Sequence, residues 1–504
     1  METSAVCEVF EKYIESAERT DPIKCVGRVT KVQGLLIESR GPQAIIGEIC
    51  RIIVPKGRGE IKAEVVGLRN ETVQLMAYNE TDGIEIGDRV IALGCRLEVP
   101  VSNKLLGRVI DPLGNPIDNK GDIASSEMYP ALANAPDPIK RKRINERITT
   151  GIRAIDGLLA LGKGQRMGIF AGSGVGKSTL LGMIARNTNA DVNVIALIGE
   201  RGREVNDFIE RDLDAEGLGR SVIIVTPSSS PPLSRLRGAY VATAVAEYFR
   251  DQGRDVMLLF DSVTRYARAM REIGLASGEP AAQKGFPPSM FDSMPKLLER
   301  SGTSEKGSIT GIYTVLVDGD DMDEPVTDTV RGILDGHIVL SRKLAHSGHY
   351  PPIDVLGSIS RLAPSIAGPL SLEASKIIRK YMADYARMED FINAGAYRPG
   401  TNPAVDIAIS KHDAIENFLM QAVDEQSSLE ETLIALSELA DIDIPDEEMT
   451  DNKSKIKSSE NRVMRKVKAP KEEPDIYGAE ETALAVNSVA ALFSSLPGMN
   501  LIEE

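Results

Sequence analysis

The sequence has no tryptophan, only four cysteines and four histidines, and no excess of basic residues. Its 59 Lys and Arg residues are outnumbered by 74 Asp and Glu residues, which gives a net charge of −15. Proteins that coat nucleic acid are usually basic and often stack bases on aromatic side chains, so both shortages argue against that function. A local basic groove remains compatible with this composition.

The cysteines and histidines form no recognisable metal or disulfide pattern. Cys7, Cys25, Cys50 and Cys95 lie far apart, without a C-x-x-C pair, and no H-E-x-x-H motif is present. This spacing predicts neither a zinc site nor a disulfide framework. We expect reduced and partly buried thiols.

The sequence predicts neither a targeting segment nor a membrane span. Residues 1–20 carry five glutamates and have no basic flank followed by an apolar run, so they are not a signal peptide. Residues 482–502 are uncharged, but Asn487, Pro497, Gly498 and further polar residues interrupt them too often for a membrane span. We therefore expect a cytoplasmic protein.

The two ends of the chain differ from its middle. Apolar residues at helical spacing over 5–19 predict an amphipathic helix within residues 1–20, with glutamates on its other face. This helix either docks on a partner protein or covers its own domain. Residues 446–504 are predicted to be a disordered charged tail, which is rich in lysine and arginine over 451–471. A short helix near its end is either a tethered interaction motif or a frayed terminus.

Between these ends, the hydrophobic pattern changes twice. Residues 21–99 contain short strand-forming runs separated by glycines, which predicts a small β-barrel or sandwich, at 25–32, 35–38, 44–54, 62–67, 72–76 and 89–93. Residues 100–150 are rich in turn signals and are expected to form a linker. Over 151–370 apolar strands alternate with helical patterns, which predicts a parallel sheet covered by helices. Residues 371–445 are expected to be helical.

The sequence AGSGVGKS at residues 171–178 follows a predicted strand and opens a predicted helix. Its glycines let backbone N–H groups converge on phosphate oxygens at a helix N-terminus, where the partial positive charge favours an anion. We predict a nucleoside triphosphate site at this loop, with Lys177 on the β- and γ-phosphates and the Ser178 hydroxyl on Mg²⁺. Ala171 stands where the strict motif has its first glycine. Because alanine is small and Gly172 follows, we expect the loop to close.

Two carboxylates follow other predicted strands. Asp261 ends the apolar strand 256–260 and is predicted to hold Mg²⁺, with a helix N-cap as the alternative. Glu200 follows the strand 192–198 and is the best candidate to orient the attacking water. Its alternative is a surface cluster of salt bridges with Arg201, Arg203 and Glu204.

These stretches together resemble the catalytic subunits of the F1/V-type rotary ATPase superfamily, and most closely the ATPases of flagellar and virulence type III protein export. The similarity spans residues 20–440, and its most specific pieces are residues 170–178, 198–205, 261–267, 285–291, 297–300, 323–326, 332–342 and 359–361. The resemblance implies an α/β protein with a RecA-like P-loop core and a parallel sheet, preceded by a small β-barrel and followed by a helical domain. It also implies assembly as a homohexamer.

The resemblance assigns roles to residues that the pattern alone leaves open. It implies that Glu200 positions the hydrolytic water with Arg201 beside it, that Tyr350 stacks on adenine, and that Arg361 reaches into the neighbouring subunit's site. By pattern alone, Tyr350 is equally an aromatic packed on prolines, and Arg361 is an ordinary basic residue. The expected catalytic residues are Lys177, Glu200, Arg201, Asp261 and Arg361. The residues expected to bind ATP are Gly172, Ser173, Gly174, Val175, Gly176, Lys177, Ser178, Thr179 and Tyr350, with Ser178 and Asp261 as the Mg²⁺ ligands.

The resemblance therefore implies an Mg-dependent ATPase that energises protein export at the inner face of the cytoplasmic membrane, through a flagellar or a virulence type III secretion apparatus, with the flagellar one favoured. Implied partners are further copies of the chain, regulator and stalk proteins, export chaperones and substrates, and a membrane-embedded export gate; nucleic acid is not among them. The alternatives are a catalytic subunit of a rotary ATP synthase, a nucleotide-gated ring that hydrolyses little, and a RecA-like nucleic-acid translocase.

Overall fold

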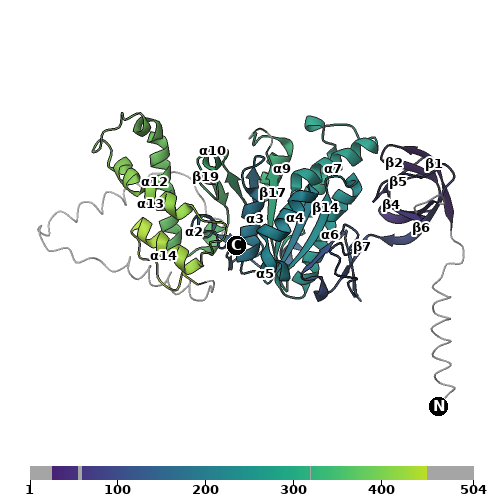
Figure 1. The fold of residues 1–504 in the computed structure, drawn as a ribbon, viewed down its shortest axis with the longest axis horizontal. Coiled ribbons are helices and arrows are strands. Elements are labelled where there is room, and N and C mark those ends of the chain that lie inside the picture. The colour runs from purple at the N-terminus through teal and green to yellow at the C-terminus, as the bar shows by residue number, and fades with distance from the viewer. Residues whose placement is uncertain (1–24, 55–58, 126, 318, 320, 451–504) are drawn as a thin grey trace, which may run out of the picture. The chain divides into compact units, whose positions relative to one another are not determined.

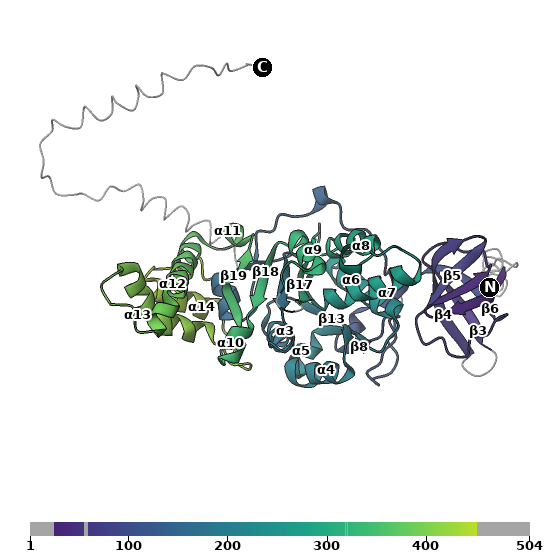
Figure 2. The same cartoon turned by 90° about the horizontal axis from the view of Figure 1, so that it is seen from above.

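A computed structural model describes residues 25–54, 59–125, 127–317, 319 and 321–450 (Figures 1 and 2). The helix expected over residues 5–19 lies outside these residues, as does the expected charged tail apart from residues 446–450. Along the described chain a β-barrel, a mixed helix–sheet core and a set of helices follow one another. This is the predicted order of the three folded parts.

The first part is a closed antiparallel barrel with the strand order β1-β2-β5-β4-β3-β6. Alternate side chains point inward because successive residues of a strand face opposite sides, and Ile37, Ile52 and Leu75 are fully buried there. The barrel confirms the prediction from the short runs. Its strands are β1 (Val26–Gln33), β2 (Leu36–Arg40), β3 (Glu48–Val54), β4 (Gly59–Arg69), β5 (Thr72–Ala77) and β6 (Arg89–Arg96).

Residues 100–150, which we expected to be a linker, are more structured than that. Strand β8 (Arg108–Ile110) pairs with β14 and forms one edge of the central sheet. The Arg108 guanidinium donates to both oxygens of Asp118, at 2.7 and 2.8 Å, which fixes this edge. A three-residue strand between turn residues is too short to show a periodic pattern. The segment also contains η1 (Asn103–Leu105), η2 (Pro138–Lys140), and the pairs β7 (Glu98–Val101) with β9 (Glu127–Pro130) and β10 (Arg147–Ile148) with β11 (Leu161–Gly162).

The central sheet has the strand order β19-β18-β12-β17-β15-β13-β14-β8. Its strands from β18 to β8 are parallel to their neighbours, whereas β19 runs antiparallel to β18. The carboxyl ends of β12, β15 and β13 therefore meet at one edge of the sheet. The strands are β12 (Arg166–Ala171), β13 (Val192–Glu200), β14 (Ser221–Pro227), β15 (Asp255–Asp261), β17 (Ser308–Leu316), β18 (Gly336–Leu340) and β19 (Ile353–Ser360), with β16 (Gly302–Thr303) beside β17.

Helices cover both faces of this sheet (Figure 1). In β13, Val194 and Ala196 belong to one core cluster and Ile195 and Leu197 to the other, as the alternation of a strand buried on both faces requires. One cluster includes α6 (Pro232–Asp251), α7 (Val263–Ala276), α8 (Pro288–Leu298) and α9 (Pro325–Ile333), and the other includes α3 (Lys177–Asn187), α4 (Gly202–Asp207), η3 (Phe208–Asp212) and α5 (Asp214–Gly219). The shorter elements are α2 (Arg153–Leu158), η4 (Gln283–Gly285), α10 (Arg342–His346) and α11 (Ala363–Ile366).

The last described part is helical, as predicted. Helices α12 (Pro369–Asn393), α13 (Pro403–Leu419) and α14 (Leu429–Ala440) are separated at the expected breaks around Gly395 and Pro403. A capping box between Ser428 and Glu431 begins α14. Leu433 and Leu436 of α14 are fully buried in the same cluster as α2, so these helices pack on the nucleotide-binding core.

A buried ion pair ties the end of α8 to the core. The guanidinium of Arg300, only 1% exposed, donates to Glu247 Oε1 at 3.0 Å, to Glu247 Oε2 at 2.5 Å and to the carbonyl of Ala131 at 2.7 Å. Arg300 is the only residue that the described structure shows donating hydrogen bonds to the Glu247 carboxylate, since the guanidinium of Arg250 lies farther away, at 4.0 Å. This geometry gives a structural reason for an arginine at the end of the stretch 297–300.

Replacing Arg300 by methionine should lower the free energy of unfolding by about 3–5 kcal/mol, because the Glu247 carboxylate would remain buried without its partner. Urea titration of the purified variant measures this change. Lys296→Met is the matched control, since Lys296 pairs with Asp292 on the same helix but both side chains are exposed. The control should change stability by less than about 1 kcal/mol. Equal losses in the two variants would contradict the role assigned to the buried pair.

Candidate active site

The glycine-rich loop connects β12 to α3 as the motif predicts. Gly174 and Gly176 have φ angles of +77° and +96°, a region that side chains with a Cβ rarely adopt, and α3 begins directly afterwards at Lys177. Ala171 is still part of β12, where it pairs with Leu316 and Leu340. It is therefore in extended conformation, which explains why the position of the first motif glycine accepts alanine.

Three charged side chains meet beside this loop. The Lys177 ammonium contacts Oδ1 of Asp261 and lies 3.8 Å from Oε1 of Glu200. The three side chains come from α3, β15 and β13, and none is more than 12% exposed. The parallel strand order places them at one edge of the sheet. The structure thus brings together three residues that are 84 positions apart at most in the sequence.

Asp261 is fixed by its neighbours on the sheet. It is 2% exposed at the end of β15, and the Thr314 hydroxyl of β17 donates to its Oδ1 at 2.8 Å. The N-cap of α7 is Ser262, whose side chain accepts from the backbone N–H of Arg265. The alternative interpretation of Asp261 as a helix cap is therefore wrong. Its carboxylate faces Lys177 instead.

The Glu200 carboxyl has an unusual electrostatic environment. Burial, together with the nearby Asp261 charge, raises the pKa of Glu200 to about 7, although Lys177 acts in the opposite direction. Oε1 of Glu200 is buried and has no hydrogen-bond partner among the described residues. A buried carboxyl oxygen without a partner is costly unless a water or ligand completes it. A carboxyl that is half ionised near neutral pH is suited to accept a proton from water.

The other residues of this turn point elsewhere. The Arg201 side chain is 78% exposed and lies 3.5 Å from Glu204, and Arg203 pairs with Asp207 at the surface. Of the predicted surface cluster, only the pair of Arg201 and Glu204 forms; Arg203 pairs with Asp207 instead, and Glu200 is buried beside Lys177. Within this chain, the Arg201 side chain does not reach the three charged side chains that meet beside the phosphate loop.

Tyr350 lies next to the phosphate loop. Its side chain is 47% exposed, and a Cβ placed on Gly176 would be 3.8 Å from its ring. The exposed ring therefore stands beside the end of the loop.

Arg361 is located at the opposite end of the sheet from the loop. It follows β19, which is antiparallel to β18, and Ser360 pairs with Gly336 at the start of β18, whereas Ala171 pairs with Leu340 at its end. Four residues of strand separate the two levels, about 13 Å at 3.3 Å per residue. The exposed Arg361 side chain donates to the carbonyl of Arg331, at 3.5 Å. It cannot serve its own chain's phosphate loop from this position.

Two residues at the site were missed from the sequence. Thr314, which donates to Asp261, is one of several hydroxyl-bearing residues of the buried strand β17, so the sequence alone does not single it out. Arg265 lies against Gly199, and its Nε is buried without a hydrogen-bond partner. Arg265 belongs to the stretch 261–267, but its spacing alone does not indicate that it faces Glu200.

The residues present fit a triphosphate with Mg²⁺. A Cβ placed on Gly174 would meet no atom within 4 Å, so the loop is open on that side. The exposed Ser178 stands in the first turn of α3, one residue after Lys177, and Asp261 supplies a buried carboxylate nearby. A hydroxyl and a carboxylate are oxygen donors of the kind that Mg²⁺ prefers.

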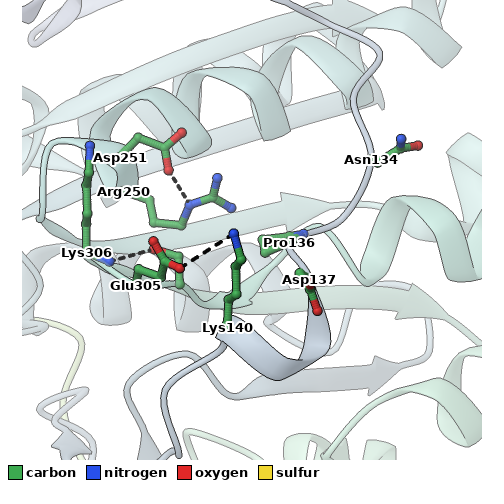
Figure 3. A pocket seen from close by; sticks show the side chains of 9 residues that line it. Asn134, Pro136, Asp137, Lys140, Arg250, Asp251, Glu305 and Lys306 are labelled. Carbon is green, nitrogen blue, oxygen red and sulfur yellow. Dashed lines mark hydrogen bonds and ion pairs between the residues drawn. The ribbon is translucent and has the colours of Figure 1, made fainter.

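A separate hollow of about 310 Å³ lies between the end of α6, residues 134–140 and the turn at residues 304–306 (Figure 3). Four of its charged side chains form ion pairs, Arg250 with Asp251 at 2.8 Å and Lys140 with Glu305 at 3.9 Å. It adjoins the starts of the parallel strands, away from the phosphate loop. We assign it no part in the chemistry.

Comparisons with known proteins agree with this architecture. A model of the ATP synthase alpha/beta family nucleotide-binding domain matches residues 151–360, and a model of that family's beta-barrel domain matches residues 29–94. A model of the T3SS EscN ATPase C-terminal domain matches residues 368–438. The three matches coincide with the core, the barrel and the terminal helices.

Individual relatives are similar over nearly their whole length. The flagellum-specific ATP synthase of Treponema pallidum (strain Nichols) is 54% identical over 444 residues, 88% of this chain and 98% of the relative. The type 3 secretion system ATPase of Xanthomonas euvesicatoria is 49% identical over 415 residues, 82% and 94% of the two chains. The solved structure of the assembled ATPase EscN in complex with its central stalk EscO, from enteropathogenic E. coli, is 44% identical, with a TM-score of 0.77, and covers 82% of this chain and 100% of that one. The chain therefore belongs to the ATP synthase alpha/beta family and, within it, to the ATPases of flagellar and type III secretion protein export.

Proposed function

We propose that this chain is an Mg-dependent ATPase that energises protein export through a flagellar or virulence type III secretion apparatus. The observation that carries the proposal is the grouping of Lys177, Glu200 and Asp261 beside a phosphate-binding loop. The C-terminal match to the T3SS ATPase domain favours an export ATPase over a rotary synthase subunit. The higher identity to the flagellar relative, 54% against 49%, favours flagellar export.

The phosphate loop holds the charge of the nucleotide. The N–H groups of residues 172–179 at the start of α3 bind phosphate oxygens, and the Lys177 ammonium exchanges its contact with Asp261 for the β- and γ-phosphates. Ser178 and Asp261 hold Mg²⁺, which, when bound, neutralises charge that develops on the phosphates. Tyr350 packs against the base. Turnover then depends on positioning and electrostatics rather than on a covalent intermediate.

Glu200 orients the attacking water. Its unpartnered Oε1 accepts the hydrogen bond of a water molecule, and in its ionised form it draws the proton away as the oxygen attacks the γ-phosphorus. Arg265, packed under the same turn, limits the movement of the Gly199–Glu200 backbone. Arg201 is exposed beside this turn and faces outward, toward a neighbouring subunit if the chain forms a ring.

Arg361 completes the site of an adjacent copy of the chain. Its position at the far end of the sheet excludes its own loop but suits a subunit that packs head to tail. A guanidinium beside the γ-phosphate stabilises the charge of the transition state. We infer a closed ring, six subunits by analogy with the family, with one composite site at each interface. EscN is known as an assembled ATPase with a central stalk, which supports a stalk partner here as well.

Chaperones, export substrates and a membrane-embedded export gate are the further partners that this function requires. None of the described helices has the length and apolarity to cross a membrane. The proposed function places the enzyme at the cytoplasmic face, in peripheral contact with the gate. In the native cell, Lys177→Ala should stop secretion of the apparatus's extracellular subunits into the medium while the chain itself accumulates normally. Undiminished secretion by that strain would contradict the proposed function.

The rate should depend on pH through Glu200. Because the folded-state pKa of Glu200 is about 7, its carboxyl is protonated in mildly acidic solution and cannot accept a proton from water. We expect kcat/KM for ATP to rise between pH 6 and 8, with a midpoint near 7, since kcat/KM reports groups of the free enzyme. The contribution of the raised Glu200 pKa to the free energy of unfolding changes with pH in the direction opposite to the rate. This contribution is complete below the ordinary carboxyl pKa and is lost as the pH rises through 7. Steady-state kinetics across this range test the rate, and a flat profile would contradict the assignment.

A nucleic-acid translocase is the alternative function, because such enzymes share the RecA-like core. An experiment therefore has to distinguish the two functions. The net charge of −15 and the lack of tryptophan disfavour the translocase. A filter-binding assay with single-stranded RNA, with and without ATP, should detect no binding at micromolar protein.

A further inference from the structure

The loop between β18 and β19, residues 341–352, joins the phosphate site to the helical domain. It contains α10 and ends with His349, Tyr350 and two prolines. The Tyr350 ring faces the phosphate loop, whereas the Tyr350 carbonyl accepts from the backbone N–H of Gln421, at 2.9 Å, just after α13. Earlier in the loop, Lys343 Nζ lies 3.1 Å from Glu389 of α12. The loop is thus held from the side of the helices.

His349 is the buried element of this connection. It is 5% exposed, and neither of its ring nitrogens has a hydrogen-bond partner among the described residues. Nε2 lies 3.4 Å from Oε2 of Glu416, whose side chain on α13 is one-third exposed. A buried imidazole with no partner is unfavourable, and a carboxylate this close is the group able to satisfy it. A small rotation of either side chain makes this contact a charge-assisted hydrogen bond.

We propose that His349 is a positioning residue that, through its contact with Glu416 of α13, holds Tyr350 against the adenine of bound nucleotide. Because Tyr350 directly follows His349, a displacement of the imidazole moves the backbone that carries the ring. The phosphates are bound at residues 172–179, whereas the backbone N–H of His349 donates to Leu344 and its imidazole lies beside Glu416. Loss of the His349–Glu416 contact therefore weakens binding of the base and leaves phosphate binding unchanged. This inference rests on the proposed role of Tyr350 as the base-stacking residue.

The test compares ADP with inorganic pyrophosphate as probes, using isothermal titration calorimetry with the full-length chain. His349→Ala should raise the Kd for ADP about tenfold, the scale of one charge-assisted contact, and should change the Kd for pyrophosphate less than twofold. In steady-state hydrolysis, KM for ATP should rise while kcat is retained. His349→Gln, which keeps a donor in the site, should recover most of the ADP affinity.

Two further variants make the test robust. Glu416→Gln removes the carboxylate charge at a partly exposed position, so it should fold normally and weaken ADP binding in the same way as His349→Ala. The losses of ADP affinity should not add in the double variant, because each substitution removes the same His349–Glu416 contact. The exposed His346, three residues earlier in the loop, gives the matched control: His346→Ala should bind both probes like the unmodified chain.

Tyr350→Ala separates the failure of this inference from the failure of the underlying site. If Tyr350→Ala weakens ADP binding but His349→Ala and Glu416→Gln do not, the positioning role is wrong while the site stands. Equal losses for ADP and pyrophosphate in the His349 and Glu416 variants would also overturn it, because the contact would then support the whole site. If Tyr350→Ala itself leaves ADP binding unchanged, the base-stacking role fails, and the inference fails with it.

Discussion

Replacing Glu200 by glutamine should lower kcat for ATP hydrolysis about 10³-fold and leave ATP binding nearly unchanged. Glutamine has the shape of the protonated carboxyl, which is already half populated at neutral pH because the pKa of Glu200 is about 7. In the variant, ATP therefore binds beside a neutral side chain of the same shape as the protonated Glu200 of the unmodified chain. The amide cannot take a proton from the attacking water, and general base catalysis contributes about 10²–10⁴ to such rates. Phosphate release at saturating ATP and titration with a non-hydrolysable ATP analogue measure the two properties separately.

Glu210→Gln is the matched control for this experiment. Glu210 lies ten residues further along the chain, in η3, and its side chain is exposed. Its variant should hydrolyse ATP at the rate of the unmodified chain. A Glu200→Gln variant that keeps its kcat within about threefold would remove Glu200 from the catalytic role, since a loss of that size is below the range of general base catalysis.

Replacing Arg361 by alanine should lower kcat by about 10³–10⁵, the contribution of an arginine that acts on the γ-phosphate from a second subunit. The loss should occur with no change in the nucleotide affinity of the isolated chain, because Arg361 is remote from its own phosphate loop. Arg398→Ala provides a control, since Arg398 is an exposed arginine in the connection between α12 and α13. That variant should retain full activity. Phosphate release at protein concentrations that support assembly measures both rates.

Mixing two inactive variants tests whether Arg361 acts between subunits. Arg361→Ala keeps an intact phosphate loop, and Lys177→Ala keeps an intact arginine. In mixed rings, some interfaces combine the intact loop of one subunit with the intact arginine of its neighbour, so activity should reappear. If Arg361 acted within its own chain, no mixture would regain activity. The account is therefore contradicted by a mixture as inactive as its two components.

Local signals were sufficient to predict much of the fold. The runs that became β1 to β6 alternate or are continuously apolar, and the phosphate loop has a fixed spacing between β12 and α3. Strand β8 was not predicted because three residues are too few to show a hydrophobic periodicity. Its place at the sheet edge depends on the Arg108–Asp118 contact. Between α4 and α5 lies the π-helical turn η3, in which the Leu213 N–H donates to the Phe208 carbonyl. The composition of the sequence does not predict a π-helical turn.

The site was less accessible to sequence reasoning than the fold. Lys177 and Asp261 are predictable because each ends or begins an element of recognisable pattern. Thr314 and Arg265 depend on which strands are neighbours, and a single sequence does not give the order β12-β17-β15-β13. Arg361 is harder still, because its proposed partner is a different molecule. His349 contacts Glu416 across 67 positions, so no local pattern pairs them.

The account depends most on one claim: a neighbouring subunit completes the site in which residues 172–179 hold the triphosphate. The direct test is a cryo-electron microscopy structure of the assembled chain with Mg²⁺ and a non-hydrolysable ATP analogue. We predict that the terminal phosphate contacts Lys177 and that the guanidinium of an adjacent subunit's Arg361 lies beside it. A terminal phosphate remote from Lys177, or an interface that leaves Arg361 in solvent, would contradict the account.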